Sequence, residues 1–387
     1  MSRTAIVHIG TEKTGTTTIQ HFLRLNRQRL AEQGIGVPET LGPITHTWLA
    51  TFAQTGDSDE DEAETVSDAL KATRLQEFET EMSALPPGIQ RVLFSSEHLH
   101  RRLATTEEVQ RLRDLLSKYF GSIRVLVYIR RQDRLAASLY STKIRYGASW
   151  DLPILPGKRA QSSHYYNYEI LLRQYIEVFG RENITVRIFE KPRLAQGDVI
   201  RDYCESVGID ESQTKGPDVK NPSLSPAALM VLGTLNERAP KRGEILIKEH
   251  FVRVLEQQFN SAQQIAPRHE ALKFYERFRD SNDWVKETFF PEMQGPLFDE
   301  DFSQYPDQQD RVQPSLREAL TVFGTLWDAQ RTQRKTLLQR IHELETILDR
   351  AGVELPPGTT RSKNPGRAGA DAGSKPRRKR PEGAASS

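Results

Sequence analysis

The sequence has little cysteine and no long apolar run. A single cysteine, Cys204, excludes an intramolecular disulfide framework and is too few for a cysteine-based metal site. The N-terminal stretch MSRTAIVHIG contains an apolar run that is too short for a signal-peptide core. No segment approaches the apolar length of a membrane span. We therefore expect a cytoplasmic protein without a membrane-spanning helix.

Charge is unevenly distributed along the chain. The net charge is +2, but residues 355–387 contain eight Lys or Arg and two Asp or Glu, so this segment carries +6 and the remainder −4. The net-acidic body gives no support to a nucleic-acid partner. Ten of those 33 residues are Gly or Pro, and large apolar residues are almost absent. We predict a disordered basic tail over 353–387, in which KPRRKR (375–380) is either solvated or contacts an anionic partner.

Short apolar runs alternate with amphipathic segments in the first half of the chain. Strands are predicted over 5–9, 91–95, 123–129 and 184–189, and helices over 16–32, 105–120 (with Thr106 as N-cap), 132–146, 168–179 and 198–207. This alternation is typical of an α/β domain with a mainly parallel central sheet.

No further strands are predicted after Asn221-Pro222. We therefore divide the chain into four segments. Residues 1–222 form the α/β core, and 223–330 form a helical extension packed on it, with helices over 225–236, 242–259 and 269–279. Residues 331–352 form a polar C-terminal helix, and 353–387 form the tail. In that helix Leu337, Ile341, Leu344 and Leu348 follow coiled-coil spacing for less than two heptads. The helix therefore either docks on its own domain or supports weak self-association.

The stretch HIGTEKTGTTTIQ follows the first strand and opens the first helix. Gly10 and Gly15 have the spacing of a nucleotide P-loop, but Lys13 precedes the second glycine and Thr16 occupies the usual lysine position. Backbone N–H groups at a strand end that opens a helix bind anions. Without the usual lysine or a clear Walker-B aspartate, the loop suits a phosphate-bearing ligand that needs no metal. The candidate binding residues are Lys13, Thr14, Gly15, Thr16, Thr17 and Thr18.

A second basic motif, YIRRQDRLAASLY, follows the strongest strand. Arg130 stands at the strand's carboxyl end, and Ser138 follows eight residues later in a helix. Cations are disfavoured at helix N-termini, so an arginine there suggests a bound anion. We expect Arg130 and Ser138 to hold a second phosphate, and Arg131 and Arg134 to face solvent. Two phosphate sites on one sheet suggest a nucleotide phosphorylated at both ends.

These two motifs resemble those of a known family. KTGTTTIQ resembles the 5′-phosphosulfate loop of sulfotransferases that use 3′-phosphoadenosine-5′-phosphosulfate (PAPS), and YIRRQDRLAASLY is similar to their 3′-phosphate motif. Residues 166–190 resemble carbohydrate-type members, and residues 221–232 resemble a segment of bacterial relatives. The resemblance spans roughly residues 3–240. It implies a P-loop-like three-layer fold, PAPS as donor without a metal, and a role for Lys13 against the bridging and leaving oxygens.

Sulfuryl transfer to an acceptor hydroxyl or amine needs a base that takes up the acceptor's proton. Glu97, in LFSSEHLH, is the candidate, because carbohydrate-type members place a glutamate after a comparable strand, usually before a lysine. Here His98 follows instead, and His98 and His100 are rival bases. His46 and His164 are further candidates for lining the acceptor site. Tyr165, Tyr166 and Tyr168 either stack on a sugar or pack in the core.

Two other functions stay open. A small-molecule kinase would need phosphate transfer from ATP without the P-loop lysine. A non-catalytic nucleotide-binding or assembly protein would use the C-terminal helix and basic tail. For a sulfotransferase, the acceptor is a hydroxyl or amine on a glycan or a small molecule, with a glycan preferred.

Overall fold

The computed structural model describes residues 3–42, 44–55, 66–216, 223–238, 245–261 and 265–352. The predicted disordered tail, 353–387, lies outside them. The chain divides into two compact units. Unit 1 comprises Met1–Ala239 and Asn260–Pro314, and unit 2 comprises Pro240–Phe259 and Ser315–Ser387. The four segments suggested by the sequence stay a prediction.

Unit 1 contains a parallel β-sheet. The described strands are β1 (Thr4–His8), β2 (Ile35–Gly36), β3 (Arg91–Ser95), β4 (Ser122–Ile129) and β5 (Ile184–Ile188), in the order β2-β3-β1-β4-β5. Every adjacent pair is parallel. The predicted α/β fold with a parallel sheet is confirmed. Two-residue β2 was not predicted, because it is too short to show an alternating pattern.

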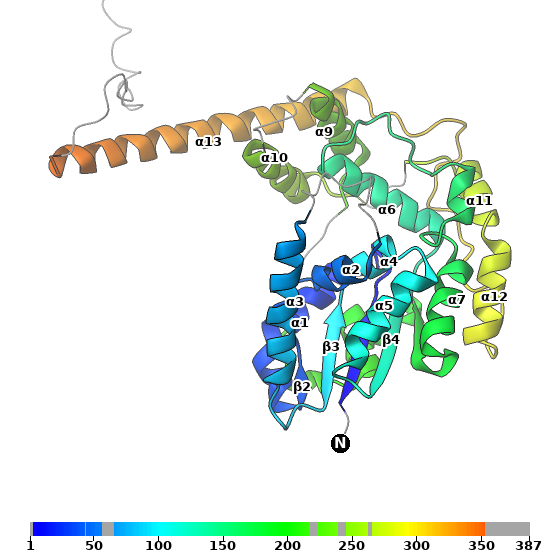
Figure 1. Cartoon of the computed structure of the whole chain (residues 1–387). Coiled ribbons are helices and arrows are strands. Elements are labelled where there is room, and N and C mark those ends of the chain that lie inside the picture. The colour runs from blue at the N-terminus through cyan, green and yellow to red at the C-terminus, as the bar shows by residue number, and fades with distance from the viewer. Residues whose placement is uncertain are drawn as a thin grey trace, which may run out of the picture. The chain divides into compact units, whose positions relative to one another are not determined.

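The helices of unit 1 cover both faces of the sheet (Figure 1). The α-helices described in unit 1 are α1 (Thr16–Glu32), α2 (Thr47–Ala53), α3 (Asp68–Ser83), α4 (His98–Arg102), α5 (Thr106–Ser117), α6 (Gln132–Arg145), α7 (Tyr168–Phe179), α8 (Val199–Val207), α9 (Pro226–Arg238), α11 (Arg268–Glu276) and α12 (Arg279–Phe289). Of these, α9 and α11 pack on α6, and α12 packs on α7. Unit 2 contains α10 (Ile245–Gln258) and α13 (Leu316–Arg350), which pack together.

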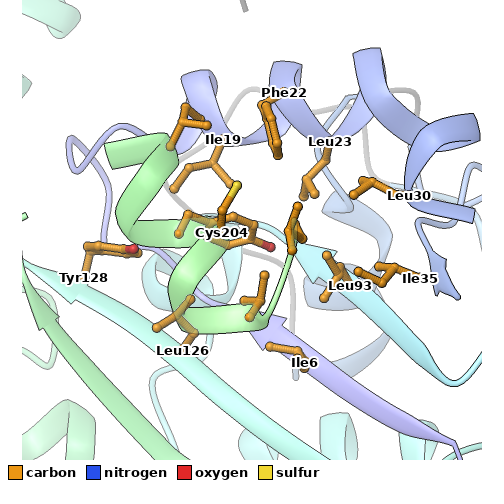
Figure 2. Close-up of a cluster of buried hydrophobic side chains, with 14 of the residues drawn as sticks. Ile6, Ile19, Phe22, Leu23, Leu30, Ile35, Leu93, Leu126, Tyr128 and Cys204 are labelled. Atoms are coloured by element: carbon orange, nitrogen blue, oxygen red, sulfur yellow. The ribbon is translucent and has the colours of Figure 1, made fainter. Parts of the chain in front are cut away.

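One face of the sheet is covered by α1 and α8. Figure 2 shows Ile19 and Phe22 of α1 and Cys204 of α8 above Leu93 and Leu126 of the strands, all in one buried cluster. Burial raises the pKa of the Cys204 thiol to about 12, so this side chain behaves as a small apolar group.

The opposite face is covered by α5 and α7. Both helices pack on β4 and on each other. Successive strand residues point to opposite faces, so Val125 and Val127 face away from the cluster that contains Leu126. All three side chains are buried, because a sheet covered on both sides leaves no solvent-facing row. Three layers follow: helices, sheet, helices.

The sequence missed or misplaced several elements. The helices α2, α3, α4 and α12 were not predicted. Thr105, not the predicted Thr106, is the N-cap of α5, and it forms a capping box with Glu108. The last helix begins at Leu316 rather than at 331, with a capping box between Ser315 and Glu318. None of the helices described is both long and apolar enough to cross a membrane.

A buried carboxylate joins β4, β5 and α8. Asp202 accepts hydrogen bonds from Tyr128 Oη at 2.8 Å, from Arg187 Nε at 2.9 Å and from the backbone N–H of Ala195 at 3.0 Å. Burial alone would raise the pKa of Asp202, but the hydrogen bonds from Arg187 and Tyr128 outweigh it and hold the pKa below its usual value. The network fixes the edge of the sheet beside the second phosphate motif.

Replacing this carboxylate should weaken the fold in a pH-dependent way. We expect Asp202→Asn to lower the free energy of unfolding by about 3 kcal/mol at neutral pH, because it leaves Arg187 without its charge partner. The folded-state pKa is depressed, so the wild-type contribution is complete above the unfolded pKa and is lost on acidification below about pH 4. Urea unfolding of the wild type and of Asp202→Asn at several pH values measures the loss of unfolding free energy and its dependence on pH. Equal loss at every pH would contradict this account.

Candidate functional site

The phosphate loop is attached to β4 beyond the end of β1. Tyr128 N–H donates to the Gly10 carbonyl at 2.6 Å, and Thr11 N–H donates to the Tyr128 carbonyl at 2.8 Å. Gly10 has φ 101°, and a Cβ there would lie 3.3 Å from Glu97 Cα, so glycine is required where the loop passes the end of β3. Parallel pairing thus continues past the strands and fixes the loop at the carboxyl edge of the sheet.

The loop's own side chains brace it and leave the start of α1 open. Thr14 is fully buried, and its hydroxyl donates to the Thr11 carbonyl at 2.6 Å. Gly15, with φ 80°, is the N-cap of α1 and has no side chain to accept from the first N–H groups. The hydroxyl of Thr16 is buried with its residue, Thr17 is exposed and Thr18 is half-buried. The backbone of this segment is therefore suited to an anion, whereas the Thr14 hydroxyl is structural.

Lys13 lies with its side chain along α6. Its backbone has φ 62°, and Nζ donates to Thr142 Oγ1 at 2.8 Å. Burial, with the charge of Arg145 adding to it, lowers the pKa of the Lys13 ammonium. An anion in the loop would offset the desolvation and the repulsion that act on this ammonium.

Arg130 reaches the same loop from the end of β4. Its Nη1 donates to the Lys13 carbonyl at 2.9 Å, and its guanidinium lies 5.8 Å from the ring centre of Phe189. The Arg130 carbonyl accepts from the Tyr168 hydroxyl, which is buried. The two motifs that the sequence separated by more than one hundred residues therefore contact each other directly.

Ser138 shares one face of α6 with Thr142 and Arg145. The spacing of four and then three residues places these side chains in line along the helix. Since Thr142 contacts Lys13, this face of α6 is turned toward the phosphate loop. Ser138 is half-buried, one turn nearer the start of α6 than Thr142, on the side of Arg130.

Arg131 does not face solvent as predicted. It is fully buried and donates to Asp133 from Nε at 2.8 Å and from Nη2 at 2.9 Å. Its guanidinium stacks 3.9 Å from the ring centre of Phe302. Arg134 is partly exposed and pairs with Asp299 at 3.5 Å. The sequence prediction failed because the residues that bury Arg131 come from a segment 170 positions away.

Glu97 stands at the carboxyl end of β3, as the N-cap of α4. Its carboxylate accepts a hydrogen bond from Gln20 Nε2 on α1, which also donates to Thr45 Oγ1 at 3.3 Å. Gly10 packs against the Glu97 backbone. The predicted base and the phosphate loop therefore lie side by side.

A second carboxylate, Glu12, belongs to the loop itself and was not predicted. It accepts a hydrogen bond from the Tyr165 hydroxyl. Burial raises the pKa of the Glu12 carboxyl, and the charge of Glu97 raises it further, against the opposing effects of Tyr165 and Arg101. Two interacting carboxyl groups thus lie near Lys13, and burial raises the pKa of one of them, Glu12.

The rival base His100 is committed to structural hydrogen bonds. Its Nδ1 accepts from Glu12 N–H at 3.4 Å, so Nε2 is the atom that donates to the Tyr165 carbonyl at 3.1 Å. Burial lowers the pKa of His100 to about 3. His98 is half-buried, with Nδ1 3.4 Å from Arg101 Nη2. Of the two, only His98 retains access toward solvent.

The remaining histidine and tyrosine candidates are mostly structural. His46 is buried, accepts from Ser95 N–H at 3.0 Å and contacts the Pro38 carbonyl at 3.0 Å. His164 contacts the His100 carbonyl at 2.9 Å. Tyr166 packs in a buried cluster with Phe274 and Phe278, and Tyr168 is buried beneath Arg130. Tyr165 contacts the loop at Glu12, and the Tyr168 hydroxyl interacts with Thr11 of the loop.

A basic cavity lies on the outer side of α1. Gln20, which holds Glu97, is followed on the same helix face by Arg24 and Arg27. The cavity has a volume of about 310 Å³ and is lined by Arg24, Arg27, Glu39, Thr40, Gly42, Trp48 and Arg74. Arg27 pairs with Glu39 at 3.3 Å, and Arg74 pairs with Glu77 at 2.7 Å and lies 5.9 Å from the ring centre of Trp48, so part of the cavity's positive charge is balanced within the chain.

Metal-ligating side chains do not gather here. Within the described ranges, no group of three or more His, Cys, Asp or Glu residues could hold a metal ion.

Comparisons with known proteins give few relatives. No known protein-family model matches the chain. An uncharacterized protein from Archaeoglobus fulgidus is 23% identical over 192 residues, covering 49% of this chain and 52% of that protein, so the match spans about half the length of that curated relative. The crystal structure of a sulfotransferase from Alicyclobacillus acidocaldarius is similar with a TM-score of 0.37 and 18% identity, covering 62% of this chain and 98% of that chain.

Anion binding in the loop should depend on the protonation of Lys13. Because the pKa of Lys13 is lowered in the unliganded loop, and an anion favours the ammonium, binding should raise that pKa and take up protons. We expect the affinity for pyrophosphate to fall as the pH rises through the lowered pKa, below the ordinary lysine value of about 10. Calorimetry in buffers of different ionisation heat measures the proton uptake. Lys13→Arg, which keeps its charge, should remove this pH dependence; a wild-type affinity that is independent of pH would contradict the assignment.

Proposed function

We propose that the protein is a sulfotransferase that moves a sulfuryl group from PAPS to an acceptor hydroxyl or amine. The observation that carries the proposal is the direct contact between the two anion-binding motifs, in which Arg130 Nη1 donates to the Lys13 carbonyl at 2.9 Å. One ligand that carries phosphate groups at two positions can engage both motifs at once. The resemblance of these two motifs to those of PAPS-dependent enzymes supports this donor.

The residues at the loop suit the charge changes of sulfuryl transfer. The acceptor oxygen or nitrogen attacks sulfur, the sulfur–oxygen bond to the 5′-phosphate breaks, and adenosine 3′,5′-bisphosphate leaves. Negative charge grows on the leaving phosphate oxygen, where Lys13 and the N–H groups at the start of α1 stabilise it. Arg130 and Ser138 hold the 3′-phosphate and so fix the orientation of the donor. Each of these steps uses protein groups alone.

Glu97 is the base in this proposal. The acceptor proton needs a carboxylate or imidazole near the loop, and Glu97 is held there by Gln20. His100 is unsuited, since both of its ring nitrogens are engaged. Glu12 accepts the hydrogen bond of the buried Tyr165 hydroxyl, and this engagement assigns it a hydrogen-bonding role. His98 stays a secondary candidate.

The basic cavity beside α1 supports an acceptor that carries negative charge. Arg24 and Arg27 continue the helix face that begins at Gln20, so an extended acceptor with its reactive group at Glu97 would run over them. Trp48 at the same cavity offers a face for a sugar ring. An acidic glycan fits this lining better than a neutral small molecule.

Binding of the donor product tests the cofactor class. We expect adenosine 3′,5′-bisphosphate to bind the wild-type chain in EDTA, and Arg130→Ala to weaken binding at least about 100-fold, because it removes a bidentate cation and a brace of the loop. Titration calorimetry measures the affinity. Lys143→Ala, which removes an exposed cation of α6 next to Thr142, is the matched control and should bind like the wild type. Binding of ATP–Mg²⁺ in preference to the bisphosphate would overturn the proposal and favour a kinase.

The rate of sulfuryl transfer tests the assignment of Glu97 as the base. We expect Glu97→Gln to lower kcat about 10³-fold while the affinity for adenosine 3′,5′-bisphosphate stays within about twofold, since general base catalysis typically contributes 10²–10⁴-fold. Glu12→Gln, an equally conservative change in the neighbouring phosphate loop, is the control and should lower kcat much less. Transfer of ³⁵S from labelled PAPS to a panel of acidic glycans measures the rate. If Glu97→Gln retained full activity while His98→Gln lost it, the base would be His98.

A further inference from the structure

The helix α13 carries a heptad stripe along almost its whole length. The sequence showed only its last part, but the helix begins at Leu316, and the spacing of four and three continues without a break. The stripe consists of Leu316, Leu320, Phe323, Trp327, Gln330, Arg334, Leu337, Ile341, Leu344 and Leu348. It covers about 48 Å of helix at 1.5 Å per residue. Eight of its ten positions are large apolar residues.

The stripe and the buried residues of α13 lie on different faces of this helix. Val322 and Leu326 of α13 are buried, and α13 packs on α10 within unit 2. By contrast, the apolar stripe residues from Leu316 to Leu344 are each between 45% and 74% exposed. Phe323 and Trp327 stack on each other with ring centres 6.4 Å apart. A continuous exposed apolar stripe of this length marks an interaction surface.

The stripe has the same succession of apolar and polar residues whether it is followed from its N-terminal or from its C-terminal end. Reversing the helix about Thr332 places apolar residues opposite apolar residues and the two polar residues opposite each other. The resulting layers are Leu316 with Leu348, Leu320 with Leu344, Phe323 with Ile341, Trp327 with Leu337, and Gln330 with Arg334. We propose that α13 pairs with α13 of a second copy of this chain in an antiparallel coiled coil, with the twofold axis at Thr332.

The polar layers select the orientation. A parallel pair would bury Arg334 against Arg334 of the second copy, and like charges there are costly. An antiparallel pair sets Arg334 against Gln330 of the second copy, whose amide oxygen can accept from the guanidinium. In the single chain Gln330 Oε1 is buried and accepts no hydrogen bond from any of the described residues, so the amide must turn outward to accept from Arg334 of the second copy. Polar residues at core positions commonly set the register and orientation of coiled coils.

The mass of the full chain in solution tests the pairing. We expect sedimentation equilibrium to give twice the chain mass of 44.1 kDa. Leu344→Glu alters two layers of the symmetric pair and should raise the dissociation constant at least about 100-fold. Thr336→Glu, an exposed change on α13 outside the stripe, is the matched control and should leave the dissociation constant unchanged. Because Leu344 is exposed in the single chain, both variants should keep the wild-type far-UV circular dichroism spectrum, which shows that each chain still folds. A monomeric wild type, or a dimer that Leu344→Glu leaves intact, would overturn the proposal.

Cysteine cross-linking tests the orientation. The paired layers predict that the double variant Leu320→Cys/Leu344→Cys forms a covalent dimer on mild oxidation, because each new thiol faces the other position on the second copy. Each single variant should stay uncross-linked. The native Cys204 is buried, with a pKa raised to about 12, and should not react. Cross-linking of the single variants would show a parallel pair and refute the antiparallel assignment.

Discussion

The parallel pairing of β1 with β4 is the constraint on which the candidate site depends. Pairing does not stop where the strands end, since Gly10 and Thr11 continue it with hydrogen bonds to Tyr128. Two residues later in each segment, Arg130 closes on the Lys13 carbonyl. A phosphate loop and a distant arginine thus become one rigid unit, and a change in strand register would displace both. The relative position of the two motifs is therefore a property of the sheet.

The second side of the site depends on β3 in the same way. Because β3 also pairs with β1, its carboxyl end brings Glu97 to the loop, where Gly10 leaves room for it. Helix α1 then ties the two together through Gln20. Three adjacent strands bring the proposed base, the proposed anion-binding loop and Arg130 to one edge. Each comes from a different part of the chain, which is the usual advantage of open parallel sheets.

Much of this arrangement could be predicted from local patterns. Four of the five described strands were predicted because buried parallel strands are short apolar runs, and Lys13, Arg130 and Glu97 follow such runs. What could not be predicted depends on contacts between distant segments. Nothing in the spacing distinguishes Glu12 as a partner of Tyr165, or indicates that residues near position 300 bury Arg131.

Two misses had a local signal that was overlooked. Thr142 follows Ser138 by one helical turn, so the same face that was expected to hold a phosphate also had to present Thr142. The pair Ser315 and Glu318 is a capping box, which sets the true start of the last helix. Had the helix been started there, the short stripe would have been recognised as a long heptad repeat. Polar Gln330 and Arg334 in its centre concealed that continuity.

The backbone of Lys13 places two demands on one residue. Its φ of 62° lies in the left-handed region, which costs a residue with a Cβ about 1 kcal/mol and suits glycine or asparagine better. The fold alone would thus favour a small, uncharged residue here, whereas the proposed anion binding favours a cationic side chain. Selection for thermostability and selection for turnover would pull position 13 in opposite directions. A laboratory library screened only for heat resistance is expected to lose this lysine first.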